Sequence, residues 1–299
     1  MGTVKVGTSS WTDPTLIKEG HFYPSTARTP ERRLRYYAEQ FPVVEVDATY
    51  YRLPEESAAL AWDERTPPGF VFDVKAFALF TLHPTPAARL PADIRGALPP
   101  SVVGKSNVYL RDLPQELFRE LLHRFHQALL PLQLAGKLGT VMLQLPPWAF
   151  PSHENREHLR IVREALPNYR CAVEFRHQSW VNEKNLERTM SFLSDGDFAY
   201  VCVDEPQGFK SSVPPLLAVT NPNLAIVRFH GRNSESWAAR GLSPSERFRY
   251  LYSEQEMAEW VPKLEKLASQ AQETHVLMNN CYRDYATTNA TQLARLLQA

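Results

Sequence analysis

Charged side chains two positions apart recur in short apolar segments of the sequence, and this spacing turns both to one face of a strand. AVEFR contains Glu174 and Arg176, AIVRFH contains Arg228 and His230, and VFDVK ends in Lys75. Glu174 is the first candidate for a general base or acid, because desolvation raises the pKa of a carboxyl group toward neutrality. Lys75 is suited to donate a proton, to stabilise an oxyanion or to form a Schiff base. His230 is the candidate proton shuttle.

The two arginines of these segments suggest a site for an anion. Arg176 and Arg228 lie on separate segments, and two planar guanidinium groups bind a carboxylate or a phosphate in bidentate fashion. The structural alternative is an ion-pair network in which Glu174 pairs with Arg176 or Lys75. Such a network costs several kcal/mol of desolvation per charge before its partners repay it, and we therefore favour a functional site.

Further polar residues share this inward phase. In VVEVD the apolar valines face outward, so Glu45 and Asp47 face inward, and Asp47 is the fourth catalytic candidate. Aromatic residues near the strand ends are suited to stack on a sugar ring. The expected substrate contacts, besides the two arginines, are Trp11, Glu45, Tyr51, Gln144, His177, Trp180, Asp204 and Asn280.

A divalent metal is the minor alternative. Glu45, Glu174, Asp204 and His230 form a conceivable donor set for Mn, Mg or Zn. The sequence has no HExxH motif, and neighbouring Lys and Arg residues would repel a cation. Because GxGxxG, Walker and GxSxG motifs are also missing from the sequence, no metal and no cofactor are expected.

The elements that must position these residues are short segments rich in Val, Ile, Phe and Tyr. Most of them are separated by amphipathic stretches with helical spacing. Strands that alternate with helices indicate a parallel sheet, and eight such units predict one (β/α)₈ TIM barrel over residues 1–299, with polar inward residues at the C-terminal strand ends, where barrel enzymes carry their sites. The eight expected strands cover residues 4–8, 43–47, 70–75, 140–145, 171–176, 199–204, 225–230 and 275–279.

The connections between these strands are uneven. Residues 205–224 are rich in proline and carry no convincing helix, so the sixth unit is expected to be irregular. The loops at residues 9–29, 83–112 and 231–252 far exceed the median connection of roughly 4–6 residues. Loops of this length usually act as lids or binding loops, and we expect all three to cover the same barrel mouth.

Composition narrows the class of protein. The 33 Lys and Arg residues balance 33 Asp and Glu residues, which weakens the case for nucleic acid or anionic membrane as a partner. The three cysteines, Cys171, Cys202 and Cys281, are far apart and are expected to be reduced core residues. Without an apolar leader or a run of about 20 apolar residues, a cytoplasmic protein is the expectation.

Several of these segments together resemble a known family. GTSSW, VEVDATYYRLP, FDVKAFALFTLHP, QLPP, EFRHQSW and RFHGR occur in the order that is typical of the YecE-like (YunF-like) family, domain of unknown function 72. The resemblance implies a TIM barrel and brings no established reaction. Two positions depart from the family pattern: Ser10 replaces the usual glycine and Asp47 the usual asparagine, so an acid pair of Glu45 and Asp47 is not expected to be the family's common chemistry.

The convergence of Glu174, Lys75, Arg176, Arg228 and His230 predicts an enzyme of acid/base chemistry. Hydrolysis, elimination or isomerisation of a small anionic, phosphate-bearing or sugar-like molecule would suit these residues. Two alternatives remain open. One is a nonenzymatic ligand-binding or adaptor protein, and the other is a metal-dependent enzyme that processes nucleic acid.

Overall fold

A closed barrel of parallel strands organises the chain. In residues 2–239 and 241–298, which the computed structural model describes, eight strands pair in the order β1-β10-β9-β8-β7-β6-β3-β2. This confirms the predicted TIM barrel and all eight predicted strands. The barrel strands are β1 (Thr3–Ser9), β2 (Val43–Val46), β3 (Val71–Lys75), β6 (Leu138–Gln144), β7 (Cys171–Glu174), β8 (Phe198–Asp204), β9 (Leu224–Phe229) and β10 (Glu273–Met278).

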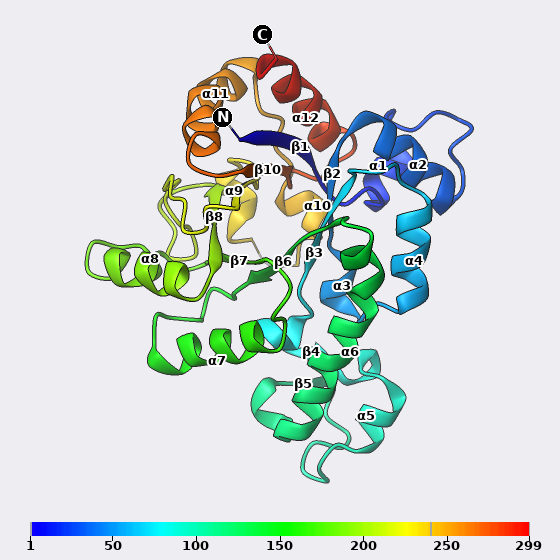
Figure 1. Cartoon of the computed structure of the whole chain (residues 1–299), viewed down its shortest axis with the longest axis vertical. Coiled ribbons are helices and arrows are strands. Elements are labelled where there is room, and N and C mark those ends of the chain that lie inside the picture. The colour runs from blue at the N-terminus through cyan, green and yellow to red at the C-terminus, as the bar shows by residue number, and fades with distance from the viewer. Residues whose placement is uncertain (1, 240, 299) are drawn as a thin grey trace.

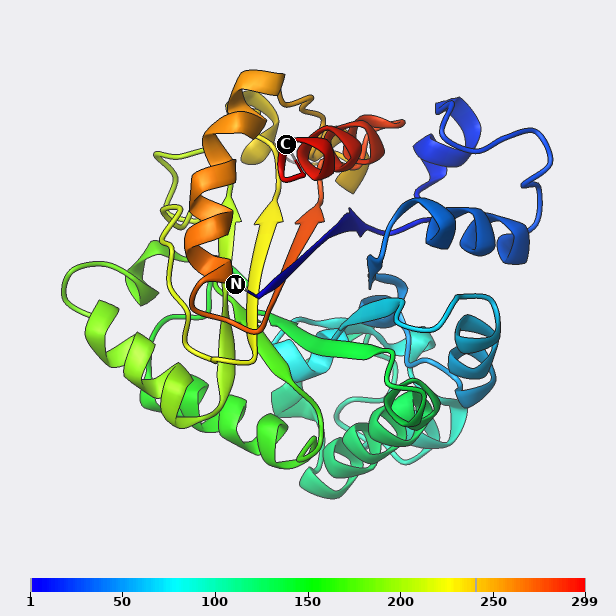
Figure 2. The same ribbon diagram turned by 45° about the horizontal axis from the view of Figure 1, so that its top comes forward.

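Helices surround the strands on the outside (Figures 1 and 2). Local sequence fixes where several of them begin: Thr29 caps α2 ahead of Pro30, and Ser253 with Glu256 forms a capping box at α11. None of the helices within residues 2–239 and 241–298 has the length and apolar character needed to cross a bilayer. The helices are α1 (Pro14–Glu19), α2 (Pro30–Gln40), α3 (Ala48–Tyr51), α4 (Glu56–Glu64), α5 (Ala92–Gly96), α6 (Gln115–Leu134), α7 (His153–Glu164), α8 (Leu186–Asp195), α9 (Ser234–Trp237), α10 (Pro244–Arg247), α11 (Glu254–Ala268) and α12 (Tyr285–Leu296).

The long loops follow β1, β3 and β9, as predicted. The loop after β1 contains α1, and the loop after β9 contains α9 and α10. The loop after β3 contains the antiparallel pair β4 (Thr85–Pro86) and β5 (Asn107–Val108) together with α5, and it projects at the bottom of Figure 1. The described residues between β8 and β9 form no helix, which confirms the irregular sixth unit. Helix α4, between β2 and β3, is absent from the sequence prediction.

Polar residues fill the barrel in two layers. In the layer nearer the N-terminal strand ends, the buried Asp73 and His275 lie 2.9 Å apart across the lumen. Burial opposes the charge of His275, but the Asp73 carboxylate outweighs it and holds the pKa of His275 above its ordinary value. Gly139 leaves room for this pair, since a Cβ atom there would lie 2.3 Å from Asp73 Oδ1. The second layer lies at the C-terminal strand ends.

Candidate active site

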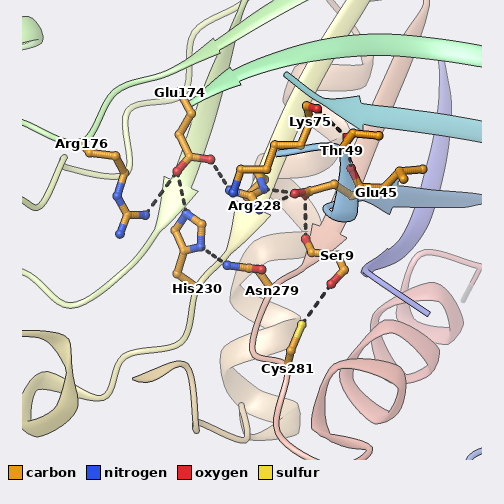
Figure 3. Close-up of polar contacts among 11 residues, drawn as sticks. Ser9, Glu45, Thr49, Lys75, Glu174, Arg176, Arg228, His230, Asn279 and Cys281 are labelled. Carbon is orange, nitrogen blue, oxygen red and sulfur yellow. Dashed lines mark hydrogen bonds and ion pairs between the residues drawn. The ribbon is translucent and has the colours of Figure 1, made fainter. Parts of the chain in front are cut away.

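Arg228 lies at the centre of the upper layer and holds two glutamates from other strands (Figure 3). Its Nε donates to Glu45 Oε2 at 2.9 Å and its Nη2 to Glu45 Oε1 at 2.8 Å, a bidentate pair between β9 and β2. Its Nη1 donates to Glu174 Oε2 on β7. All three side chains are buried. These three residues form an ion-pair network, which is the structural alternative to a functional site.

Within this network Glu174 is held in its ionised form. Burial alone would raise its pKa, but the Arg228 guanidinium and the hydrogen bond with His230 outweigh burial and hold the pKa well below its ordinary range. A carboxylate with so low a pKa is a weak base near neutral pH. The expectation of a raised pKa at Glu174 is therefore wrong, because the positive charges beside it lower the pKa by more than burial raises it.

His230 is fixed between two partners. Its Nε2 lies 3.1 Å from Glu174 Oε1, and Asn279 Nδ2 lies 2.7 Å from its Nδ1. Burial lowers the pKa of His230 to about 3, so the ring is neutral at physiological pH. An amide nitrogen only donates, so Nδ1 accepts and the proton lies on Nε2, where it is shared with Glu174. His230 is thus placed as a neutral hydrogen-bond donor, in contrast to the predicted shuttle.

Arg176 is also occupied. Its Nη1 lies 3.2 Å from Glu174 Oε1 and 3.2 Å from Glu205 Oε2, and its guanidinium lies 4.6 Å from the ring centroid of Trp237. Burial raises the pKa of Glu205 to about 7 against the opposing charge of Arg176. Because Arg176 and Arg228 already hold carboxylates, the structure does not provide the predicted anion clamp between them.

Above the network lies a pocket of about 250 Å³ at the C-terminal barrel mouth, which we call the barrel pocket. The loop after β9 contributes one wall, and Ser245 Oγ donates to Asp13 Oδ2 at 2.8 Å, which joins that loop to the loop after β1. Most lining residues are polar. They are Ser9, Asp13, Glu45, Asp47, Tyr50, Tyr51, Lys75, His83, Gln144, Leu242, Pro244, Arg247, Phe248, Asn279 and Cys281.

Lys75 opens onto this pocket from the end of β3. Its Nζ lies 4.9 Å from the ring centroid of Tyr50, and within residues 2–239 and 241–298 no carboxylate oxygen lies within 4.0 Å of it. Glu45 and Glu174, the glutamates of the network below the pocket, are both bound to Arg228. Burial lowers the pKa of Lys75, and the positive charge of Arg228 lowers it further.

Asp47 follows β2 and is one of the three carboxylic acid residues that line the barrel pocket. Burial and the negative charge of Glu45 raise its pKa to about 6, while Lys75 opposes this rise. The Thr49 hydroxyl donates to the Lys75 backbone carbonyl at 2.6 Å, so the turn that carries Asp47 is tied to the end of β3. Asp47 and Lys75 are consequently two groups of one pocket whose pKa values are both displaced toward neutrality.

Seven expected contacts do not line the barrel pocket: Arg176 and Arg228 of the network, Asp204, and the four described next. Trp11 packs edge-on against Trp62 and Phe72 in the core. Trp180 is fully buried, stacks on Phe175 at 4.3 Å and donates to a backbone carbonyl. His177 bonds with Ser179 at the start of a 3₁₀ helix, Gln178–Trp180. Asn280 is buried and donates to the Tyr250 carbonyl and to Asn289. By contrast, Gln144 and Tyr51 line the pocket as expected.

Asp204 also points away from the lumen, which corrects its predicted phase. It accepts hydrogen bonds from Arg232, Tyr252 and Trp260 outside the barrel. Glu205, the next residue, points inward instead.

Asp204 and Asn280, which were predicted to face the lumen site, are each one position from the residue that does so. Val203 and Leu277 pair in register with Arg228, so they share its inward face. Counting two residues onward from each gives Glu205 and Asn279, the two residues that join the network. Alternation counted from these strand partners would have found them.

The conceivable metal donor set is not assembled. Asp204 faces outward, and Glu45 and Glu174 are bound to Arg228. Among the residues that the structure describes, no group of three or more His, Cys, Asp or Glu side chains is arranged to hold a metal ion.

The pocket includes other residues that the sequence prediction missed. Ser9 donates to Glu45 at 2.8 Å, and burial lowers the pKa of His83 to about 4. All three cysteines are free; Cys171 and Cys202 are buried as predicted, whereas Cys281 lines the pocket. Burial raises the pKa of the Cys281 thiol, so it is not a thiolate at neutral pH.

Comparisons with known proteins agree with this architecture. A model of the family described as "Protein of unknown function DUF72" matches residues 5–299. The UPF0759 protein YunF of Bacillus subtilis (strain 168) is 32% identical over 297 residues, which cover 98% of this chain and 94% of that protein.

Two solved structures of DUF72 family proteins are similar along their whole length. The crystal structure from Enterococcus faecalis V583 has a TM-score of 0.78 and 25% identity, and the match covers 99% of this chain and 96% of that one. The crystal structure from Thermotoga maritima MSB8 has a TM-score of 0.74 and 31% identity, with 99% and 100% coverage. None of these descriptions names a reaction.

Proposed function

The chain belongs to the DUF72 family of proteins of unknown function, and from its barrel pocket we propose that it is an enzyme that transfers protons on a small sugar-like molecule. One observation carries the proposal. Lys75 opens onto the pocket without an ion-pair partner within the described residues, next to Asp47, whose pKa is raised to about 6. Pairs of titratable groups with displaced pKa values are typical of acid/base sites.

The size and lining of the pocket favour a sugar-like molecule. A volume of about 250 Å³ is below the roughly 300–1,000 Å³ that is common for drug-sized ligands. Ser9, Gln144, Asn279 and the two tyrosines offer neutral donors and acceptors for hydroxyl groups. The charged lining residues are of both signs, which suits a neutral polar molecule better than a compact anion.

The roles follow from the pKa directions. Asp47 is ionised above about pH 6 and accepts a proton from a carbon next to a carbonyl group. The Lys75 ammonium donates to the carbonyl oxygen, where negative charge develops in the enediolate. Return of the proton from Asp47 to the neighbouring carbon, together with transfer of the hydroxyl proton of that carbon to the former carbonyl oxygen, gives isomerisation. Elimination results instead when protonated Asp47 gives its proton to a hydroxyl group one carbon further on, which leaves as water. Below the pocket, Glu174 stays ionised, and Arg228 pairs with it and with Glu45.

The test is hydrogen exchange in deuterated water. Aldoses, ketoses and sugar acids are first screened by thermal shift, and ligands that stabilise the protein are followed by NMR for deuterium at the carbon next to the carbonyl. We expect exchange with the unmodified protein, and rates about 10²–10⁴ lower in Asp47→Asn and Lys75→Met. Lys184→Met, an exposed lysine outside the pocket, is the matched control.

The pH profile identifies Asp47 as the base. A base must be deprotonated, so the rate rises with pH through about 6, and it falls again at higher pH once the Lys75 ammonium loses its proton. Asp47→Asn removes the titrating carboxyl group and with it this rise of the rate near pH 6. A rate in Asp47→Asn that equals that of the unmodified protein would refute the role of Asp47.

A nonenzymatic binding protein is the second candidate, and one observation favours it. Glu174 and Arg228, at the centre of the barrel, are held in ion pairs and are not free to react with a substrate. The same experiment separates the two proposals. A ligand that stabilises the protein but shows neither exchange nor conversion would support the binding protein.

We also propose that the protein works in the cytoplasm. Its three cysteines are free, which suits a reducing compartment.

A further inference from the structure

A second and larger hollow lies beside the barrel pocket. It has a volume of about 910 Å³, and its walls are residues 51–55 and residues 88–92 with Arg95, with Arg124 of α6 between them. We call it the arginine groove. Its two walls follow β2 and β3, which are neighbours in the barrel. The groove therefore lies on the same rim as Lys75 and Asp47.

Two arginines of the groove have no acidic partner. Arg89 and Arg95 are exposed, and within the described ranges 2–239 and 241–298 neither has a carboxylate oxygen within 4.0 Å. Arg124 differs, because it holds Asp93 and Glu120. The groove thus presents two guanidinium groups whose hydrogen-bond donors face water or a ligand.

The groove and the barrel pocket share one lining residue, Tyr51. The Arg89 guanidinium lies 5.1 Å from the ring centroid of Tyr51. Leu53 and Leu90 give the groove an apolar part. One molecule that extends past Tyr51 would place one end beside Lys75 and the other beside Arg89.

We propose that the arginine groove binds the anionic arm of the substrate whose sugar-like head occupies the barrel pocket. This inference rests on the proposed function. The arm carries two negative charges, as phosphate or carboxylate groups, because two unpaired guanidinium groups bind such a group through charge-assisted hydrogen bonds. The groove exceeds the barrel pocket in volume, so the arm is the larger part of the molecule.

This division explains where an anion binds in this protein. The sequence predicted an anion between Arg176 and Arg228, but both already hold glutamates. Arg89 and Arg95 lie in the inserted segment after β3 and have no such partner in the described part of the chain. Binding energy from an arm remote from the reacting atoms helps to position the head for reaction.

The experiment measures binding of small dianions by isothermal titration calorimetry. Inorganic phosphate and succinate are titrated separately, at about pH 8, into the unmodified protein, into Arg89→Gln/Arg95→Gln and into Arg28→Gln/Arg188→Gln. Arg28 and Arg188 are exposed and line neither hollow, so the second double variant controls for the same change in charge. Melting temperatures verify that each variant is folded.

We expect the unmodified protein and the control to bind at least one dianion, and the groove variant to bind it at least tenfold more weakly. Raising the salt concentration weakens binding, because exposed charges are screened. The anion bound more tightly identifies the arm as phosphate or carboxylate. Failure of both dianions to bind the unmodified protein, or equal affinity in the groove variant, would overturn the inference.

Lys75→Met separates this inference from the proposed function. Lys75 does not line the groove, so this variant is expected to bind the dianion as the unmodified protein does. Dianion binding without any hydrogen exchange would support the groove while contradicting the proton-transfer proposal. Hydrogen exchange on neutral sugars without dianion binding would support the proton-transfer proposal and contradict the proposal for the groove.

Discussion

Replacing Arg228 tests how much its ion pairs with Glu45 and Glu174 stabilise the fold. In Arg228→Met, Glu45 and Glu174 remain buried and lose the guanidinium that pairs with both of them. Breaking a buried ion pair from one side typically costs about 3–5 kcal/mol of unfolding free energy. For a chain of 299 residues the melting temperature is expected to fall by roughly 5–8 °C.

The dependence on pH follows from the pKa of Glu174. In the unmodified protein that pKa lies well below the ordinary value of 4.5, so ionised Glu174 stabilises the fold above pH 4.5, and this stability is lost as pH falls through the folded pKa. Arg228→Met raises the pKa of Glu174, because burial is then opposed by fewer positive charges. Protonation of Glu174 in the variant relieves part of the cost, so the difference between the two proteins narrows as pH falls from 7.5 to 5.

Urea unfolding at these two pH values measures the difference. Arg160→Met is the matched control, since Arg160 forms an exposed pair with Glu157 at 3.2 Å and is expected to lose less than about 1 kcal/mol. Arg228→Lys keeps the charge, loses the bidentate geometry and should fold with a loss of about 1–3 kcal/mol. A loss below about 1 kcal/mol in Arg228→Met, with the same value at both pH values, would refute the reasoning.

Three further changes test other parts of the structure. Lys75→Met should raise stability by about 0.5–1.5 kcal/mol in urea unfolding, because a desolvated ammonium without an acidic partner in the described residues costs free energy; a clear loss would indicate a structural ion pair. Gly139→Ala should lose about 1–3 kcal/mol in thermal unfolding, because its Cβ atom would displace Asp73 from His275; an unchanged melting temperature would contradict the packing of that layer. Ser10→Gly should be about 1–3 kcal/mol more stable than Ser10→Ala, because both lose the hydroxyl and only glycine suits a φ of 98°; equal stabilities would show that the backbone there is unstrained.

Within single strands, periodicity alone predicted much of the site. Glu45, Asp73, Lys75, Glu174 and Arg228 face the lumen as expected, because the valines and phenylalanines between them must face the helices. The prediction failed on β8 and β10, where Asp204 and Asn280 were chosen over Glu205 and Asn279. Nearly all residues of these two strands are buried and most are apolar, so the sequence does not distinguish their two faces, and only pairing with Arg228 on β9 fixes the phase.

What the sequence determined by itself is the barrel, its long loops and the rim on which its polar residues gather, since these follow from local patterns and from the order of the elements. Which charges pair with one another was decided only by the tertiary structure. Glu45 and Arg228 are 183 positions apart, and closure of the barrel is what brings their atoms to 2.8 Å. A pKa depends on such distances. Closure of the barrel places Glu174 against Arg228, which keeps Glu174 ionised, and it leaves Lys75 and Asp47 lining the pocket.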